Sequence, residues 1–184
     1  MKYWFVMLLF ASSLYAESEA LDVGAYIRMG DITGSNNGGE YRLNTRLDIS
    51  LSEEMQDALR NGVRQVYLLE VQVREPRFQL YYQEVASEKH RYELRFHTLS
   101  RKYLVNYLRT QTQRSFYTLS AALEYMGKIE NLRVLSNKSL SDFDNFQVRA
   151  KFMLDIDELP LPLQIHSLLN RGWRISSKWK TIEL

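Results

Sequence analysis

Three histidines, His90, His97 and His166, are the side chains of this sequence best suited to acid–base or metal chemistry. None lies three or four residues from another histidine, the spacing that places two imidazoles on one helix face toward a metal. The chain has no cysteine and no Gly-x-Ser-x-Gly turn to expose a nucleophilic serine. We therefore expect no catalytic, cofactor-binding or metal-binding residue, and we interpret the protein as a non-enzyme that needs no cofactor.

Carboxylates gather at Asp155, Asp157 and Glu158, just before Leu159 and Pro160. A carboxylate pair divides acid and base roles when burial separates the two pKa values. We interpret this group instead as the start of a helix or turn, and no Asp-x-Asp-x-Asp-Gly calcium loop occurs. The remote alternative is a hydrolase whose site is assembled across strands, with His97 and Asp155 as participants.

Basic residues alternate outward along several expected strands. If those strands adjoin, they form one positive face that suits an anionic lipid head group or an acidic protein surface. Lysine and arginine are also common on exposed strand positions, where they discourage edge-to-edge pairing. The candidate interaction face consists of Arg42, Arg46, Arg91, Arg95, Arg149, Lys151, Arg174, Lys178 and Lys180.

The elements that would position these residues are mostly strands. Apolar and polar residues alternate with period two over 41–49, 92–98 and 146–156, which predicts strands with one buried and one wet face. Further strands are expected over 63–74, 78–85, 102–108 and 173–181, with a polar turn at 87–89 and a short charged hairpin over 85–91. The glycine-rich segment 30–40 is expected to be a loop, and the alternating Leu-Pro segment 159–164 an extended path that mostly tucks into the core.

Two helices have recognisable ends. The first is expected after Ser50 and Glu53, which have capping-box spacing, and ends near Gly62. The second begins near Thr118 and stops at Gly127. Together these patterns predict a mainly β (α+β) fold: an antiparallel β-sandwich or strongly bent sheet of about eight or nine strands, with two or three short helices. The expected core consists of Tyr41, Leu43, Leu47, Ile49, Leu69, Val71, Val73, Leu94, Phe96, Val148, Phe152, Leu154, Ile175 and Trp179.

The first sixteen residues have the layout of a secretory leader. Lys2 precedes an uncharged apolar run of 13 residues over 3–15, and Ala16 follows. A spanning helix needs roughly 20 residues, so a cleaved leader fits better than a retained anchor. We expect cleavage after Ala16, with Ala20 as the fallback, and one globular β-rich domain over 17–184 in the periplasm. No transmembrane segment is expected after the leader is removed.

Five stretches spread over the mature chain resemble an uncharacterised family of exported proteobacterial proteins, the DUF4390-like domain of unknown function. They are SLSEEMQDALRNGV at 50–63, LSRKYLVNY at 99–107, SFYTLSAALEYMGKIENLRV at 115–134, VRAKFMLDIDELPLPLQ at 148–164 and WRISSKW at 173–179. The resemblance implies an exported single-domain protein whose gene often neighbours one for a membrane sensor kinase. It implies no catalytic or ligand-binding residue.

The formal net charge of only +2 predicts no general attraction to nucleic acid. The leading hypothesis is an exported, periplasmic, non-catalytic interaction or accessory module, whose partner is a protein in the cell envelope such as a membrane sensor kinase. The alternative is a small-ligand or lipid-binding β-sandwich, because tyrosines suit such pockets. The sequence does not indicate an oligomeric state.

Overall fold

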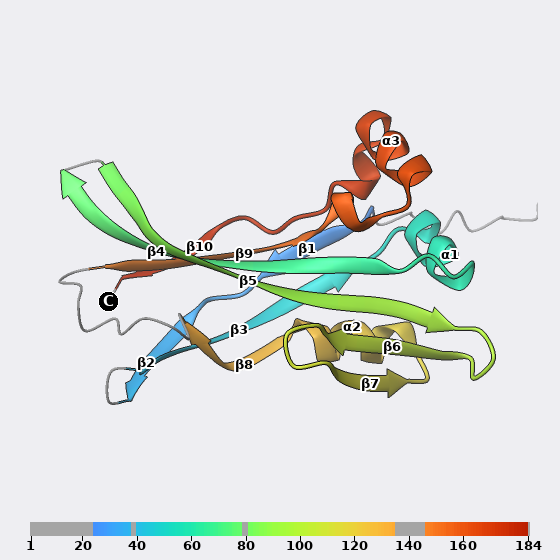
Figure 1. Ribbon diagram of the computed structural model, residues 1–184, viewed down its shortest axis with the longest axis horizontal. Helices are drawn as coiled ribbons and strands as arrows, with labels where there is room; N and C mark the ends of the chain where they lie inside the picture. The colour runs from blue at the N-terminus through green and yellow to red at the C-terminus, as the bar shows by residue number, and fades with distance from the viewer. Residues whose placement is uncertain (1–23, 38–39, 79–80, 135–145, 184) are drawn as a thin grey trace, which may run out of the picture.

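The computed structural model describes residues 24–37, 40–78, 81–134 and 146–183. Two antiparallel sheets face each other, as Figure 1 shows. Buried apolar side chains of both sheets form one shared cluster, so the mainly β, sandwich-like fold expected from the alternating patterns is confirmed. The expected leader over 1–16 and both expected cleavage positions lie outside the described residues.

The larger sheet has the strand order β10-β9-β4-β5-β6-β7. It is built around the long hairpin of β4 (Gln65–Phe78) and β5 (Tyr81–His97), which pair over almost their whole length. β6 (Lys102–Tyr107) and β7 (Thr112–Phe116) continue the sheet beyond β5. β9 (Gln147–Leu154) and β10 (Lys180–Glu183) extend it beyond β4.

The smaller sheet is centred on β3 (Glu40–Ser50). β1 (Tyr26–Met29) and β2 (Thr33–Asn37) pair in succession along one side of β3. β8 (Lys128–Val134) pairs with the other side, but only as far as the Arg46–Lys128 pair. On that side, no described strand pairs with β3 from residue 47 to its end.

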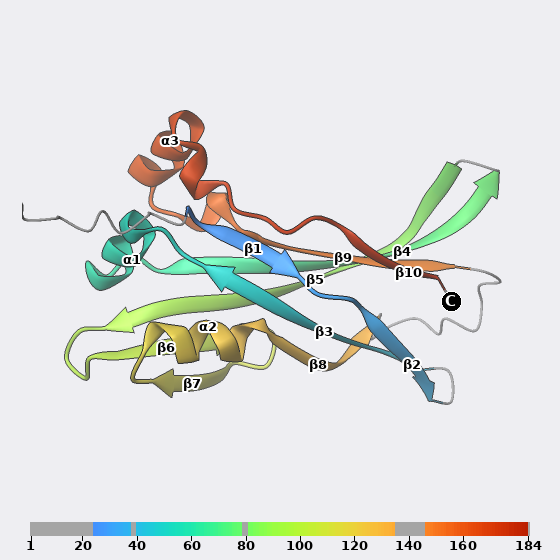
Figure 2. The same ribbon diagram turned by 180° about the vertical axis from the view of Figure 1, so that it is seen from behind.

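Short helices close the molecule. α1 (Glu53–Arg60) and α3 (Leu161–Leu169) lie at the same end, and α2 (Leu119–Gly127) lies over β6 and β7 (Figures 1 and 2). Short 3-10 helices, η2 (Ile156–Glu158) and η3 (Arg171–Trp173), flank α3. Gln65, which is fully buried, fixes α1 to β4 because its Nε2 donates to the Met55 carbonyl at 2.8 Å.

One cluster of buried apolar side chains joins the inner faces of both sheets with α1 and α2. It includes all but two of the core residues expected from the alternation. Phe96 is half-buried, with its ring against Tyr103 at a centroid distance of 5.0 Å. Trp179 is also half-buried, and it lies against the Arg149 guanidinium at 4.2 Å. Arg149 pairs with Gln72, whose side chain lies on the outer face of the larger sheet, so the Arg149 side chain lies on that face too. Trp179 therefore packs on the outer face and not in the core.

Three sequence-based boundaries were wrong. β5 runs without a break through 85–91, because every residue there except Val85 pairs with β4 across the ladder, so neither the turn at 87–89 nor the charged hairpin exists. Much of the segment 30–40 pairs with β3 as β2 rather than forming a loop. α1 is capped not by Ser50 but by Ser52, whose side chain accepts from the Met55 amide at 3.3 Å.

The Leu-Pro segment forms the start of α3 and not an extended path. Pro160 is its N-cap and Pro162 lies in its first turn, where a missing amide proton costs nothing because those amides have no partner within the helix. Leu159 is buried as expected, but Leu161 projects into solvent. The expected strand over 173–181 is reduced to η3, one isolated bridge at Ser176 and β10.

Candidate functional site

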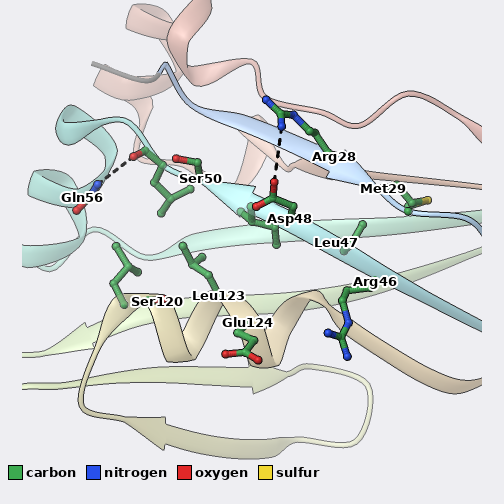
Figure 3. Close-up of a pocket in the computed structure, with 14 residues that line it drawn as sticks. Arg28, Met29, Arg46, Leu47, Asp48, Ser50, Gln56, Ser120, Leu123 and Glu124 are labelled. Carbon is green, nitrogen blue, oxygen red and sulfur yellow. Dashed lines mark hydrogen bonds and ion pairs between the residues drawn. The ribbon is translucent and has the colours of Figure 1, made fainter. Parts of the chain in front are cut away.

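A cleft of about 840 Å³, open to solvent, extends from β1 across the end of β3 to α2 (Figure 3). We call it the β3–α2 cleft. Its size falls in the range of pockets that enclose small molecules or short peptide segments. It is lined by Arg28, Met29, Gly30, Arg46, Leu47, Asp48, Ile49, Ser50, Leu51, Gln56, Leu119, Ser120, Leu123 and Glu124.

The β3 wall follows from period-two alternation. Leu47, Ile49 and Leu51 are buried, while Arg46 and Asp48 are exposed on the outer face. Asp48 pairs with Arg28, its direct neighbour on β1, at 4.0 Å. The cleft therefore has apolar side chains at its base and charged side chains at its rim.

The α2 wall begins where the helix meets β3. Thr118 caps α2 by accepting from the Ala121 amide at 3.2 Å, and Leu123 turns inward. Gly127 ends the helix against the strand: a Cβ added there would lie 2.5 Å from the Leu47 carbonyl oxygen. The absence of a side chain at Gly127 therefore lets α2 approach the backbone of β3 at this point.

The other end of the cleft is bounded by α1. Gln56 Nε2 donates to the Leu51 carbonyl at 2.9 Å, and the close-up in Figure 3 draws this bond. The accessible edge of β3 therefore runs from the contact with Gly127 to the bond with Gln56. At roughly 3.3 Å per residue, that edge is long enough for a segment of about four residues.

Two charged side chains at the rim form no ion pair with any residue in the described ranges. Arg46 comes from β3 and Glu124 from α2, and Figure 3 shows them on the two walls of the cleft. The rim thus offers one positive and one negative group to an occupant.

The candidate basic face is divided between the two sheets. Arg42 and Arg46 lie on the smaller sheet, whereas the basic residues of β5 and β9 lie on the outer face of the larger one. Carboxylates offset the positive charge of three of these residues: Arg91 pairs with Asp155 at 3.6 Å, Arg95 with Glu93 at 3.8 Å and Lys180 with Asp31 at 3.2 Å. Three others have neutral neighbours: Arg149 donates to Gln72 at 2.7 Å, Arg174 donates to the Ser167 carbonyl and Lys151 lies 6.0 Å from the Trp179 ring. Lys178 is exposed. The outward direction of these strand residues was predictable, but their division between sheets was not, because the pattern carries no strand order.

The remaining candidates for chemistry lie apart from the cleft. His97 is exposed and its Nδ1 lies 2.9 Å from the Ser100 hydroxyl, within the turn that follows β5. Asp155 pairs with Arg91, and His166 lies 3.3 Å from a Glu54 carboxylate oxygen. Among the described residues, no group of three or more His, Asp or Glu side chains is placed to hold a metal ion.

His90 is a buried residue whose setting the sequence did not reveal. Its Nδ1 lies 2.6 Å from the Tyr107 hydroxyl, and its Nε2 lies 3.7 Å from Glu88, which also pairs with Arg109. Burial lowers the pKa of His90, although the Glu88 carboxylate opposes the shift. The pairing of Leu69 with His90 placed this ring on the inner face of β5. Because it is enclosed and does not line the cleft, we interpret it as part of the interior.

The sequence of this chain matches one family of known proteins. A family model described as "Domain of unknown function (DUF4390)" matches residues 25–183. The chain belongs to this family. The match covers every described strand and helix, so the DUF4390 domain includes both walls of the cleft. No curated protein and no solved structure matches the chain.

Membership confirms the resemblance seen in the five quoted stretches, two of which cover α1 and α2. The DUF4390 family is described only as a domain of unknown function, so it assigns no role to the cleft residues. Within the part of the chain that the structure describes, no helix is long and apolar enough to span a bilayer.

Proposed function

We propose that this protein is an exported, non-catalytic accessory module of the cell envelope that holds a partner protein in the β3–α2 cleft. The observation that carries this proposal is the cleft itself, with its apolar base and charged rim. Such a surface binds by burying apolar groups while the rim selects the partner by charge. Its lining includes two hydroxyls, Ser50 and Ser120, but no histidine or cysteine to activate them.

The compartment proposed for this function is the periplasm. The support is the leader-like segment over 1–16, with its basic start, apolar centre and small residue at the end. The partner class is a membrane sensor kinase or another envelope protein, as the resemblance implies. The periplasmic part of such a partner can meet the cleft only if the folded domain is on the outer side of the inner membrane.

Site-specific photocrosslinking in the expressing cell tests the proposal. A photoreactive residue replaces Ser120, which is exposed and lines the cleft. The matched control replaces Ser87, an exposed serine on the outer face of β5. We expect Ser120 to give one dominant protein adduct in the envelope fraction, identified by mass spectrometry, and Ser87 to give none.

Two outcomes contradict this function. Equal adducts from both positions mean that the cleft has no special role. Adducts from Ser120 to lipid or to a small molecule, without protein, instead favour the ligand-binding alternative, which the volume and the apolar base of the cleft also suit.

A further inference from the structure

The amide and carbonyl groups of successive β3 residues point alternately to the two sides of the strand. The Gly30 amide donates to the Arg46 carbonyl at 2.8 Å, so the backbone groups of Arg46 face β1. Asp48 and Ser50 face the same way, because they pair with Arg28 and Tyr26. By this alternation, the amide and carbonyl of Ile49 point to the opposite side, where the cleft lies.

No strand of the described ranges covers Ile49 on that side. The pairing of β3 with β8 ends at Arg46, and no described residue forms a backbone hydrogen bond with Ile49 there. Its side chain is buried and it lines the cleft, so the alternation of β3 directs its amide and carbonyl away from β1, toward the α2 wall. An unpaired strand edge of this kind is a template for another extended chain.

We infer that the occupant of the β3–α2 cleft is an extended polypeptide segment of the partner, which adds to the edge of β3 as a short strand. This inference rests on the proposed function and specifies its binding mode. An extended chain supplies an amide and a carbonyl at the spacing of Ile49, which an acyl chain does not. The bound segment is about four residues long. It lies between the contact of Gly127 with Leu47 and the hydrogen bond of Gln56 with Leu51.

The cleft also specifies which side chains the segment carries. Alternate residues point down toward Leu119 and Leu123, so these positions are apolar. The intervening residues point out past Arg46 and Glu124, neither of which has an ion-pair partner among the described residues. The occupant therefore alternates apolar with polar residues, and an acidic group meets Arg46 while a basic group meets Glu124.

Backbone N-methylation tests this binding mode. Random decapeptides displayed on phage are selected against the full-length chain as purified from expressing cells, and the tightest binder is synthesised with one N-methyl group at each position in turn. We expect binders with alternating apolar residues. N-methylation should weaken binding by about tenfold or more at the one position that pairs with Ile49, because it removes the hydrogen bond to the Ile49 carbonyl, and by less than about threefold at the positions on either side.

Matched variants locate the bound peptide. Ser120→Trp fills the cleft and should weaken binding at least about tenfold, whereas Ser87→Trp on the opposite sheet should leave it unchanged. Thermal melts of both variants establish that they are folded. The inference is overturned if no peptide is selected, if no single position is selectively sensitive to N-methylation, or if folded Ser120→Trp binds as the parent does.

The two proposals fail separately. A protein adduct from Ser120 combined with peptides that are insensitive to N-methylation leaves the proposed function in place and removes strand addition. Vesicles of phosphatidylethanolamine and phosphatidylglycerol provide the lipid comparison, and displacement of a weak peptide signal by these vesicles overturns the inference in favour of lipid.

Discussion

Replacing Phe152 by alanine should lower the free energy of unfolding by about 3–5 kcal/mol. Phe152 is fully buried at the centre of β9. Its ring stacks on Tyr67 at a centroid distance of 5.8 Å and lies 6.0 Å from the Tyr92 ring. Removing it leaves a cavity bordered by two large rings that the paired strands hold in place, so little of the space can close. Urea denaturation followed by fluorescence measures the change.

Phe96 provides the matched control for this experiment. It lies on β5 but is only half-buried, so Phe96→Ala should cost about 1 kcal/mol, mostly from the ring contact with Tyr103. Equal losses for the two variants would mean that Phe152 does not occupy the tightly packed interior described here.

Replacing Trp173 by alanine should also cost about 3–5 kcal/mol. Trp173 is fully buried, and its Nε1 donates to a Glu54 carboxylate oxygen at 2.9 Å. Glu54 on α1 also accepts from Asn170 at 3.3 Å. The indole therefore joins α1 to the segment that follows α3, and its loss opens a cavity and removes a charge-assisted hydrogen bond. Thermal unfolding should show a decrease of about 2–4 °C in Tm per kcal/mol.

Two further variants separate packing from hydrogen bonding at this position. Trp173→Phe keeps most of the buried ring but loses the donor, so it should cost about 1.5–3 kcal/mol. Glu54→Ala removes the acceptor while keeping the indole. If Trp173→Ala is no less stable than Trp173→Phe, the buried area of the indole contributes nothing and the packing described here is contradicted.

Period-two alternation predicted the strands whose two faces differ in environment. In β3 and β9, buried residues alternate with half-buried or exposed ones, and the limits of both strands were close to those expected. β5 was divided in two because 87–89 is a run of three polar residues, Ser, Glu and Lys, of which Glu and Lys are uncommon in strands. In the structure, the long partner β4 keeps that stretch extended. Local composition does not report such a long-range partner.

The Leu-Pro segment shows a different limit. Proline fixes a backbone angle that both an extended path and the first turn of a helix accept, so the residues themselves did not decide between them. The residues after the prolines, including Gln164 and Ser167, continue the chain as a helix. Gln164 Nε2 stabilises its start by donating to the Leu159 carbonyl at 2.8 Å. As a result, α3 exposes Leu161, which the expected extended path placed in the core. Three further apolar side chains of the helix are also exposed: Ile165, Leu168 and Leu169.

The cleft could be predicted only in part. The sequence indicated α2 with both its ends and placed Leu47 and Ile49 on the buried face of a strand. It did not indicate that β8 stops pairing at Arg46, nor that Gly127 brings the helix against β3. Both facts depend on which elements lie next to β3. The alternation of residues along one strand does not indicate its neighbours.

Amide hydrogen exchange along β3, measured by NMR on the unbound protein, tests the central claim that this strand has a free edge at the cleft. The account predicts that the Ile49 amide exchanges at least about a hundredfold faster than the amides of Asp48 and Ser50, which face β1. An Ile49 amide protected as strongly as these neighbours would show that the edge is already occupied and would contradict the account.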